Sequence, residues 1–353
     1  MKKALKITSI VLIALIVLAM LVILGFKAYD RIKYDSFYDE AKVEFYIPGL
    51  MEGYVPQGFD YLEEEKVFLA CGYMSNDEAS RIYVIDEDGD KFYYKELKTT
   101  VGDPYTGHTG GIAYYGDYVY ITGDTGIDVF DMNEILDNNG KPAYCRGEIS
   151  TEKYGINPAF CFVYDEELYV GEFHRDEDYQ TDITHHIKTP AGDENKALMI
   201  SFDLARDTLK SHFGIAGEVP GEKLEPTPSS AYSIPSFVQG ACITTDGKIV
   251  LSTSWGLSTS NLYIYDFKKI NSSTDSIKAK EIYGDKLEYA IPFHYVDSAN
   301  QVDTIKAPPM AEEIVYMDGK IWIMNESASN KYIFGKFTTG NNLYSVEYPK
   351  KAK

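Results

Sequence analysis

The sequence predicts an all-β domain with the architecture of a β-propeller, preceded by one transmembrane helix. Three observations support this prediction: a long apolar run near the N-terminus, a unit of short strands present in five copies, and little helical periodicity after residue 33. The 353 residues are 44% apolar and 25% charged, a composition typical of a folded globular chain. This composition excludes a disordered chain and a polytopic membrane protein.

The first 33 residues form the predicted membrane segment. Residues 10–26 are all apolar or Gly, and the 20 residues between Lys6 and Lys27 carry no charge. A helix of this length spans roughly 30 Å, the thickness of the hydrocarbon core of a bilayer. The run is longer than that of a typical signal peptide, and no Ala-x-Ala site follows it. We therefore expect an uncleaved signal anchor, with a cleaved signal peptide as the alternative.

Charge is divided unevenly along the chain. Six basic side chains and one acidic side chain lie in residues 1–33, which leaves 28 basic and 53 acidic side chains for residues 34–353. Such an acidic domain excludes a nucleic-acid binder, because phosphate binding needs a basic face. A single N-terminal anchor normally leaves the following domain outside the cell. We expect residues 1–33 to form a cytoplasmic tip and anchor at the cell membrane, and residues 34–353 an extracytoplasmic domain.

The repeated unit is a small residue, a short apolar strand, a polar turn, a second alternating strand and a third strand that usually ends in Asp. Turns such as Asp246-Gly247 and Asp318-Gly319 are typical of tight antiparallel hairpins. A fourth strand follows the first unit at residues 91–97. Four antiparallel strands per unit are typical of a propeller blade, whereas a pair of β-sandwiches predicts no such recurrence. The five copies are residues 57–86, 109–131, 157–203, 239–266 and 312–347.

The number of blades depends on how the ring closes. The fifth copy leaves little room for a fourth strand, and the strand at residues 42–49 has no hairpin partner of its own. Placing that strand on the outside of the last blade closes the ring and removes an exposed edge. We therefore expect five four-stranded blades closed by an N-terminal strand. Six blades are the alternative, with the additional blade around residues 287–295.

Candidate ligand-binding residues lie where the innermost strands enter the channel, because propellers bind ligands at a channel mouth. Gln57, Gln239 and Glu312 occupy equivalent places in their copies, and His108 and Asn157 lie two residues earlier. Residues just past the second strands form the other predicted lining. These residues include Asp124 and Glu172, and Trp255 follows a strand end near the same mouth.

Carboxylate and amide oxygens at this mouth suit a hard cation such as Ca²⁺, and Glu312, Asn157 and Gln239 are the candidate ligands. The same polar residues would equally well cap strand ends and bond one another across the channel. His174, His185 and His186 lie in an acidic insertion with no zinc-ligand spacing, so we expect a solvated loop there.

Other chemistry finds little support in the sequence. Motifs for a serine hydrolase, a zinc peptidase or a nucleotide-binding loop are absent. A pair of carboxylates for glycoside hydrolysis could be drawn from Asp60, Asp124, Glu172 and Glu312. The sequence does not give the distance between the two carboxyl groups, on which such a mechanism depends. The four cysteines are expected to be buried thiols, with a Cys145–Cys161 disulfide as the alternative.

The recurring Gln-Gly or Gly-Gly entry, followed by a hairpin and a strand ending in Tyr-x-Tyr-Asp or Ile-Asp, resembles the broad propeller group of lactonase-like and NHL-like proteins. The resemblance covers residues 43–347 and consists of the blade pattern. In lactonase-like propellers acidic and amide side chains at the strand entrances hold a metal, which by analogy implicates Gln57, Asn157, Gln239 and Glu312. The chain departs from that pattern in having one carboxylate there and five blades.

These observations favour a membrane-anchored extracytoplasmic propeller that acts as a binding or scaffold module for a glycan, a peptide or an envelope protein. The alternative is a metal-dependent hydrolase of the lactonase or glycosidase kind, acting at the channel mouth. The sequence does not decide between an enzyme and a binding module.

Overall fold

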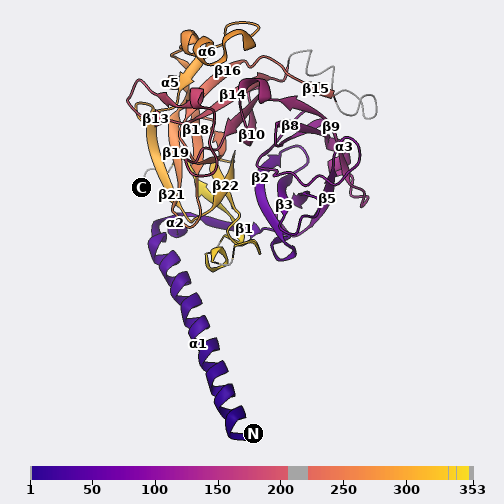
Figure 1. Ribbon diagram of the computed structural model, residues 1–353, viewed down its shortest axis with the longest axis vertical. Helices are drawn as coiled ribbons and strands as arrows, with labels where there is room; N and C mark the ends of the chain where they lie inside the picture. Colours follow the sequence, from indigo (N-terminus) through magenta and orange to yellow (C-terminus); the bar gives the residue numbers. More distant parts are fainter. Residues whose placement is uncertain (1, 206–221, 333, 339, 350–353) are drawn as a thin grey trace.

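The computed structural model describes residues 2–205, 222–332, 334–338 and 340–349. After a long N-terminal helix in the sequence, the strands form a propeller whose blades surround a central axis (Figure 1). The innermost strands contact one another in a closed ring, in the order β2, β6, β10, β17, β22 and back to β2. The predicted all-β propeller is therefore confirmed, and the described residues form five blades.

Each blade is an antiparallel sheet numbered from the axis outward. The first blade contains β2 (Tyr54–Leu62), β3 (Val67–Met74), β4 (Arg81–Asp86) and β5 (Phe92–Lys98), and the second contains β6 (Ile112–Tyr115), β7 (Tyr118–Thr122), β8 (Gly126–Asp131) and β9 (Ala143–Ser150). The third contains β10 (Pro158–Tyr164), β11 (Glu167–Glu172), β14 (Ala197–Asp203) and β16 (Ser230–Ile234). The fourth contains β17 (Val238–Ile243), β18 (Lys248–Thr253), β19 (Ser260–Asp266) and β21 (Gln301–Ala307).

The fifth blade joins the two ends of the domain. It contains β22 (Ala311–Met317), β23 (Lys320–Asn325) and β24 (Asn342–Glu347), and β1 (Lys42–Tyr46) pairs with β24 as its outer strand. The register places Val43 opposite Tyr344. The predicted closure by an N-terminal strand is confirmed, and it covers what would otherwise be a free edge of β24.

The residues considered for a sixth blade instead extend the third blade. Within them β20 (Phe293–Tyr295) pairs in parallel with β16. A second short parallel strand, β15 (Glu222–Leu224), pairs with β9, and β9 also pairs in parallel with β5. A small hairpin of β12 (Ile187–Lys188) and β13 (Glu194–Asn195) lies in the insertion after β11.

Close approach at the axis explains the small residue at the start of each unit. A Cβ at Gly58 would lie 2.6 Å from the backbone of Ile112 on the next innermost strand, and a Cβ at Gly240 would lie 2.6 Å from Cα of Glu313. Apolar side chains then fill the space between neighbouring blades. Phe68 stacks on Phe59 with ring centroids 5.1 Å apart and contacts Trp322 of the fifth blade at the same distance.

Helices contribute little to the domain itself. Within the N-terminal helix α1 (Lys2–Lys33), the span Lys6–Lys33 is long and apolar enough to cross a membrane, and its most apolar window is exposed. It leads into α2 (Asp35–Glu40), whose buried Phe37 contacts the ring of Tyr344 at 5.7 Å. Short helices α3 (Met132–Leu136), α5 (Phe267–Asn271) and α6 (Ser276–Tyr283) follow third strands. All four cysteines are buried free thiols, so Cys145 and Cys161 do not form a disulfide.

Candidate functional site

The central channel has two ends. At the entrance end the innermost strands begin, and at the exit end they turn into the second strands. In four innermost strands the pairing register with the second strand shifts near the start of the strand. The shifts lie at residues 56–58, 158–160, 238–240 and 311–314. Gln57, Gln239 and Glu312 lie within these irregular steps, so the alignment of the repeats places them equivalently. Asn157 precedes β10, and His108 precedes β6.

A buried carboxyl pair lies at the entrance end. Burial raises the pKa of Glu312 well above its usual value, and the hydrogen-bonded Glu326 carboxyl adds to the shift. Glu326 in turn accepts hydrogen bonds from Nε2 of Gln57 and from the hydroxyl of Tyr332, both at 2.8 Å. Burial also raises the pKa of Glu326. The raised pKa values of both carboxyls disfavour two adjacent charges at this site.

A lysine and an imidazole stand beside this pair. The ammonium of Lys331 lies 4.7 Å from the ring centroid of Tyr73 and bonds its hydroxyl, and the ring of His108 lies 4.8 Å from that of Tyr73. Desolvation in the channel mouth, together with the charge of Lys331, lowers the pKa of His108 to about 4 although the side chain keeps an exposed edge. Asp124 is exposed nearby and opposes this shift. His108 is thus neutral at physiological pH.

Glu172 binds parts of the third blade together. Its buried carboxylate lies 2.9 Å from Nδ1 of His185 and accepts the backbone N–H of Leu198 at 2.9 Å. His185 and His174 are both 1% exposed, so the prediction of a solvated loop is wrong for these two histidines, whereas the acidic side chains at residues 176–178 are exposed as predicted. The reason is that the insertion folds back over the blade, where His185 bonds the buried Glu172 carboxylate and His174 bonds the hydroxyl of Thr181.

Trp255 belongs to an aromatic cluster at the rim of the entrance end. The guanidinium of Arg175 lies 4.2 Å from its ring centroid, and the rings of Phe173 and Tyr179 lie 5.9 and 5.8 Å away. Trp255 is 36% exposed. The cluster is a candidate surface for stacking a ligand.

Calcium at the entrance end stays a prediction. Of its proposed ligands, Glu312 is buried, Gln239 is half-buried and Asn157 is exposed. Among the described residues there is no group of three or more His, Cys, Asp or Glu side chains arranged to hold a metal ion.

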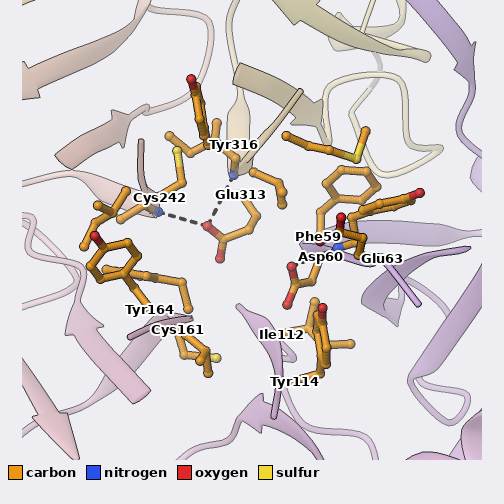
Figure 2. Close-up of a pocket in the computed structure, with 18 of the residues that line it drawn as sticks. Phe59, Asp60, Glu63, Ile112, Tyr114, Cys161, Tyr164, Cys242, Glu313 and Tyr316 are labelled. Atoms are coloured by element: carbon orange, nitrogen blue, oxygen red, sulfur yellow. Dashed lines mark hydrogen bonds between the residues drawn. The ribbon is translucent and has the colours of Figure 1, made fainter. Parts of the chain in front are cut away.

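A cavity of about 790 Å³ occupies the exit half of the channel (Figure 2). Every innermost strand contributes to its wall. Tyrosines from several strands line the wall, among them Tyr61, Tyr114, Tyr164 and Tyr316, and the thiols of Cys161 and Cys242 lie deeper. Burial raises the pKa values of both thiols well above their usual range, so they stay protonated and act as small apolar groups. The cavity is large enough for a ligand of several hundred cubic ångströms.

Two carboxyl groups face each other across this cavity, Asp60 on β2 and Glu313 on β22 (Figure 2). Oε1 of Glu313 accepts backbone hydrogen bonds from Ala241 at 2.9 Å and Ile314 at 3.2 Å. Its Oε2 is buried and has no hydrogen-bond partner among the described residues. Burial raises the pKa of Glu313 well above its usual value, and the Asp60 charge contributes. Burial raises the pKa of Asp60 to about 7.

Sequence reasoning treated Asp60 as one of several possible carboxylates and missed Glu313. A signal was present, because the innermost strands of other copies read Gln57-Gly58 and Gln239-Gly240 where the fifth reads Glu312-Glu313. A carboxylate in place of the recurrent glycine marks a strand that places a polar group at the axis.

No protein-family model and no curated protein sequence matches the chain. Among solved structures, the chain is similar to the PQQ-bound aldose sugar dehydrogenase of Streptomyces coelicolor, with 13% identity, coverage of 87% of this chain and 97% of that one, and a TM-score of 0.43. It is also similar to CoXyl43, a GH43 β-xylosidase/α-arabinofuranosidase from a compost metagenome, with 10% identity, coverage of 88% and 96%, and a TM-score of 0.43. A chain of the nidogen/laminin complex matches with 11% identity, coverage of 77% and 73%, and a TM-score of 0.35. Likeness at this level carries no information on activity.

Proposed function

We propose that the chain is a membrane-anchored extracytoplasmic propeller that binds a saccharide in the exit half of its channel. The observation that carries the proposal is the pair of facing carboxyls, Asp60 and Glu313, in a cavity lined by tyrosines. Anchoring is supported by the exposed apolar helix α1.

A saccharide matches the chemistry of this wall. Oε2 of Glu313 has no partner among the described residues, and such a buried group gains most from a ligand hydroxyl. Aromatic side chains such as Tyr164 and Tyr316 offer broad apolar faces with a polar edge, which suits the C–H and O–H faces of a sugar ring. Within the described part of the chain, Lys66 at the lip is the single basic residue of the lining, so an anionic ligand is disfavoured.

Titration of full-length protein in nanodiscs with neutral oligosaccharides tests the proposal. We expect binding to weaken at least about tenfold in Asp60→Asn and Glu313→Gln, which corresponds to about 1.4 kcal/mol. Both changes preserve side-chain shape, and the amide oxygen introduced by Glu313→Gln still accepts the Ala241 N–H. Asp103→Asn, an exposed carboxylate at the entrance end, is the matched control and should bind like the wild type. Equal affinity of all three variants, or preference for peptides over every saccharide, would contradict the proposal.

Hydrolysis of the bound saccharide is the second candidate function. The observation that favours it is the pKa of about 7 at Asp60, which suits a general acid or base near neutral pH. In that case Asp60→Asn should abolish release of reducing sugar while saccharide binding is still detectable. If the wild type binds saccharide but releases no reducing sugar, hydrolysis is contradicted and only the binding function stands.

A further inference from the structure

The anchor helix contacts the domain through one aromatic group. Phe26 is the last residue of the apolar run, and its ring lies 6.2 Å from that of Phe334 and 5.8 Å from that of Phe337. Both phenylalanines lie between β23 and β24, where the chain forms the short helix η5 (Gly335–Phe337). This connection begins at the entrance end of the fifth blade, and its first residue is Glu326 of the carboxyl pair.

The described part of this connection has the composition of a membrane-interface segment. Phe334 is 56% exposed although it touches Phe26. Lys331 and Lys336 lie on either side of Phe334 in the sequence, and basic side chains beside an exposed aromatic ring are typical of a membrane interface. In the structure their ammonium groups bond Tyr73 and Asn330. Met51, 71% exposed, is held beside it by a 2.7 Å hydrogen bond from Asn330 to its backbone oxygen.

A further contact also places the base of α1 at the entrance end. The hydroxyl of Tyr34, immediately after α1, lies 3.2 Å from the hydroxyl of Thr259, which precedes β19 at that end. Phe26 lies about two helical turns before Tyr34, toward the membrane. Phe26 therefore lies on the membrane side of the contact that Tyr34 makes with the domain.

We propose that the connection between β23 and β24 is a second membrane contact, which inserts Phe334 into the lipid interface beside Phe26. The inference rests on the proposed anchoring by α1. An aromatic side chain at the level where a transmembrane helix leaves the hydrocarbon is favoured in the interface.

Lipid-phase quenching of single fluorophores on full-length protein tests this contact. The native cysteines are buried, so labelling is directed to a cysteine introduced at an exposed site. Phe334→Cys reports on the contact and Met51→Cys is a second position in it. Phe92→Cys, with a native side chain 55% exposed at the start of β5 at the exit end, is the matched control, and Leu18→Cys in α1 reports on anchoring. The proteins are placed in phosphatidylcholine nanodiscs with or without a bromo-lipid.

We expect the bromo-lipid to reduce emission at Leu18, Phe334 and Met51 and to leave emission at Phe92 unchanged. Quenching at Leu18 without quenching at Phe334 and Met51 would overturn the second contact and leave the anchor standing. Absence of quenching at Leu18 would overturn the anchor itself. Equal quenching at Phe92 and Phe334 would overturn the assignment of the membrane contact to the connection between β23 and β24.

Discussion

The two halves of the channel each contain a pair of buried carboxyl groups, but the pairs are satisfied differently. At the entrance end Glu326 lies beside Glu312 and accepts hydrogen bonds from Gln57 and Tyr332, while Oε1 of Glu312 has no partner among the described residues. At the exit end Glu313 uses one oxygen for backbone N–H groups and presents the other to the cavity. Each pair therefore keeps one buried oxygen without a partner among the described residues. That of Glu313 belongs to a residue of the cavity wall, where a ligand could bond it, and Glu312 is not part of that wall.

The contrast originates in two adjacent residues. An irregular step in β22 between Ala311 and Ile314 directs Glu312 toward the entrance pair and Glu313 toward the exit cavity. A β-bulge or similar irregularity changes the direction of side chains, which in a regular strand would point alternately to opposite faces of the sheet. One local distortion thus serves both halves of the channel.

The largest expected effect comes from removing Glu313. Glu313→Ala leaves the buried N–H of Ala241 without its acceptor, so the free energy of unfolding should fall by about 2 kcal/mol. Glu312→Ala should cost less, because Oε1 of Glu312 has no partner among the described residues and Glu326 repels its charge. Urea unfolding of both variants at neutral pH measures the difference.

Glu313→Gln is the control for this comparison. Its amide oxygen accepts the same two N–H groups, so stability should stay close to that of the wild type. If Glu312→Ala proves as costly as Glu313→Ala, the two halves do not differ in the way described.

The sequence predicts more of the fold than of the candidate site. Hairpin turns, the alternation of strands and the unpaired strand at residues 42–49 are local signals, and together they determine blade number and closure. The exit cavity depends on which side chains from five distant strands meet at the axis. No local sequence pattern predicts that Asp60 faces Glu313, because the direction of Glu313 depends on the irregular pairing in β22.

The histidine insertion shows the same limit. His185 and Glu172 are separated by 13 residues in an acidic stretch, and their contact requires that the insertion fold back on the blade. Composition indicates a solvated loop there, and tertiary packing overrides it.

The next largest expected effect is a difference in pH dependence between the two halves. The pKa of Asp60 is raised to about 7 from 3.8, so the folded state binds the extra proton between these values. The stability that Asp60 contributes is present below about pH 4 and is lost as pH rises through 7. Asp60→Asn should therefore gain stability relative to the wild type as pH rises from 5 to 7, by up to about 1.4 kcal/mol per pH unit.

His108 at the entrance should behave with the opposite sign. Its pKa is lowered to about 4 from 6.5, so the wild type loses stability as pH falls through this window. His108→Gln should gain relative stability toward acid pH, and less than Asp60→Asn gains toward neutral pH because the ring keeps an exposed edge. Urea unfolding from pH 4.5 to 7.5 measures both. If the stability of both variants relative to the wild type changes with pH in the same direction, the two halves of the channel do not differ in pH dependence.

The smallest expected effect concerns Trp255 at the entrance rim. The contact of Arg175 with its ring is a partly exposed cation–π pair, so Trp255→Ala should lower the free energy of unfolding by about 0.5–1 kcal/mol. Arg175→Gln and the double variant complete a cycle that isolates the pair, since Arg175 also bonds Glu177 and Asp178. The informative measurement is saccharide affinity, which should be unchanged in Trp255→Ala because the exit cavity does not include it. A loss of affinity larger than that of Glu313→Gln would move the binding site to the entrance end, and the facing carboxyls of the exit cavity would then be structural groups.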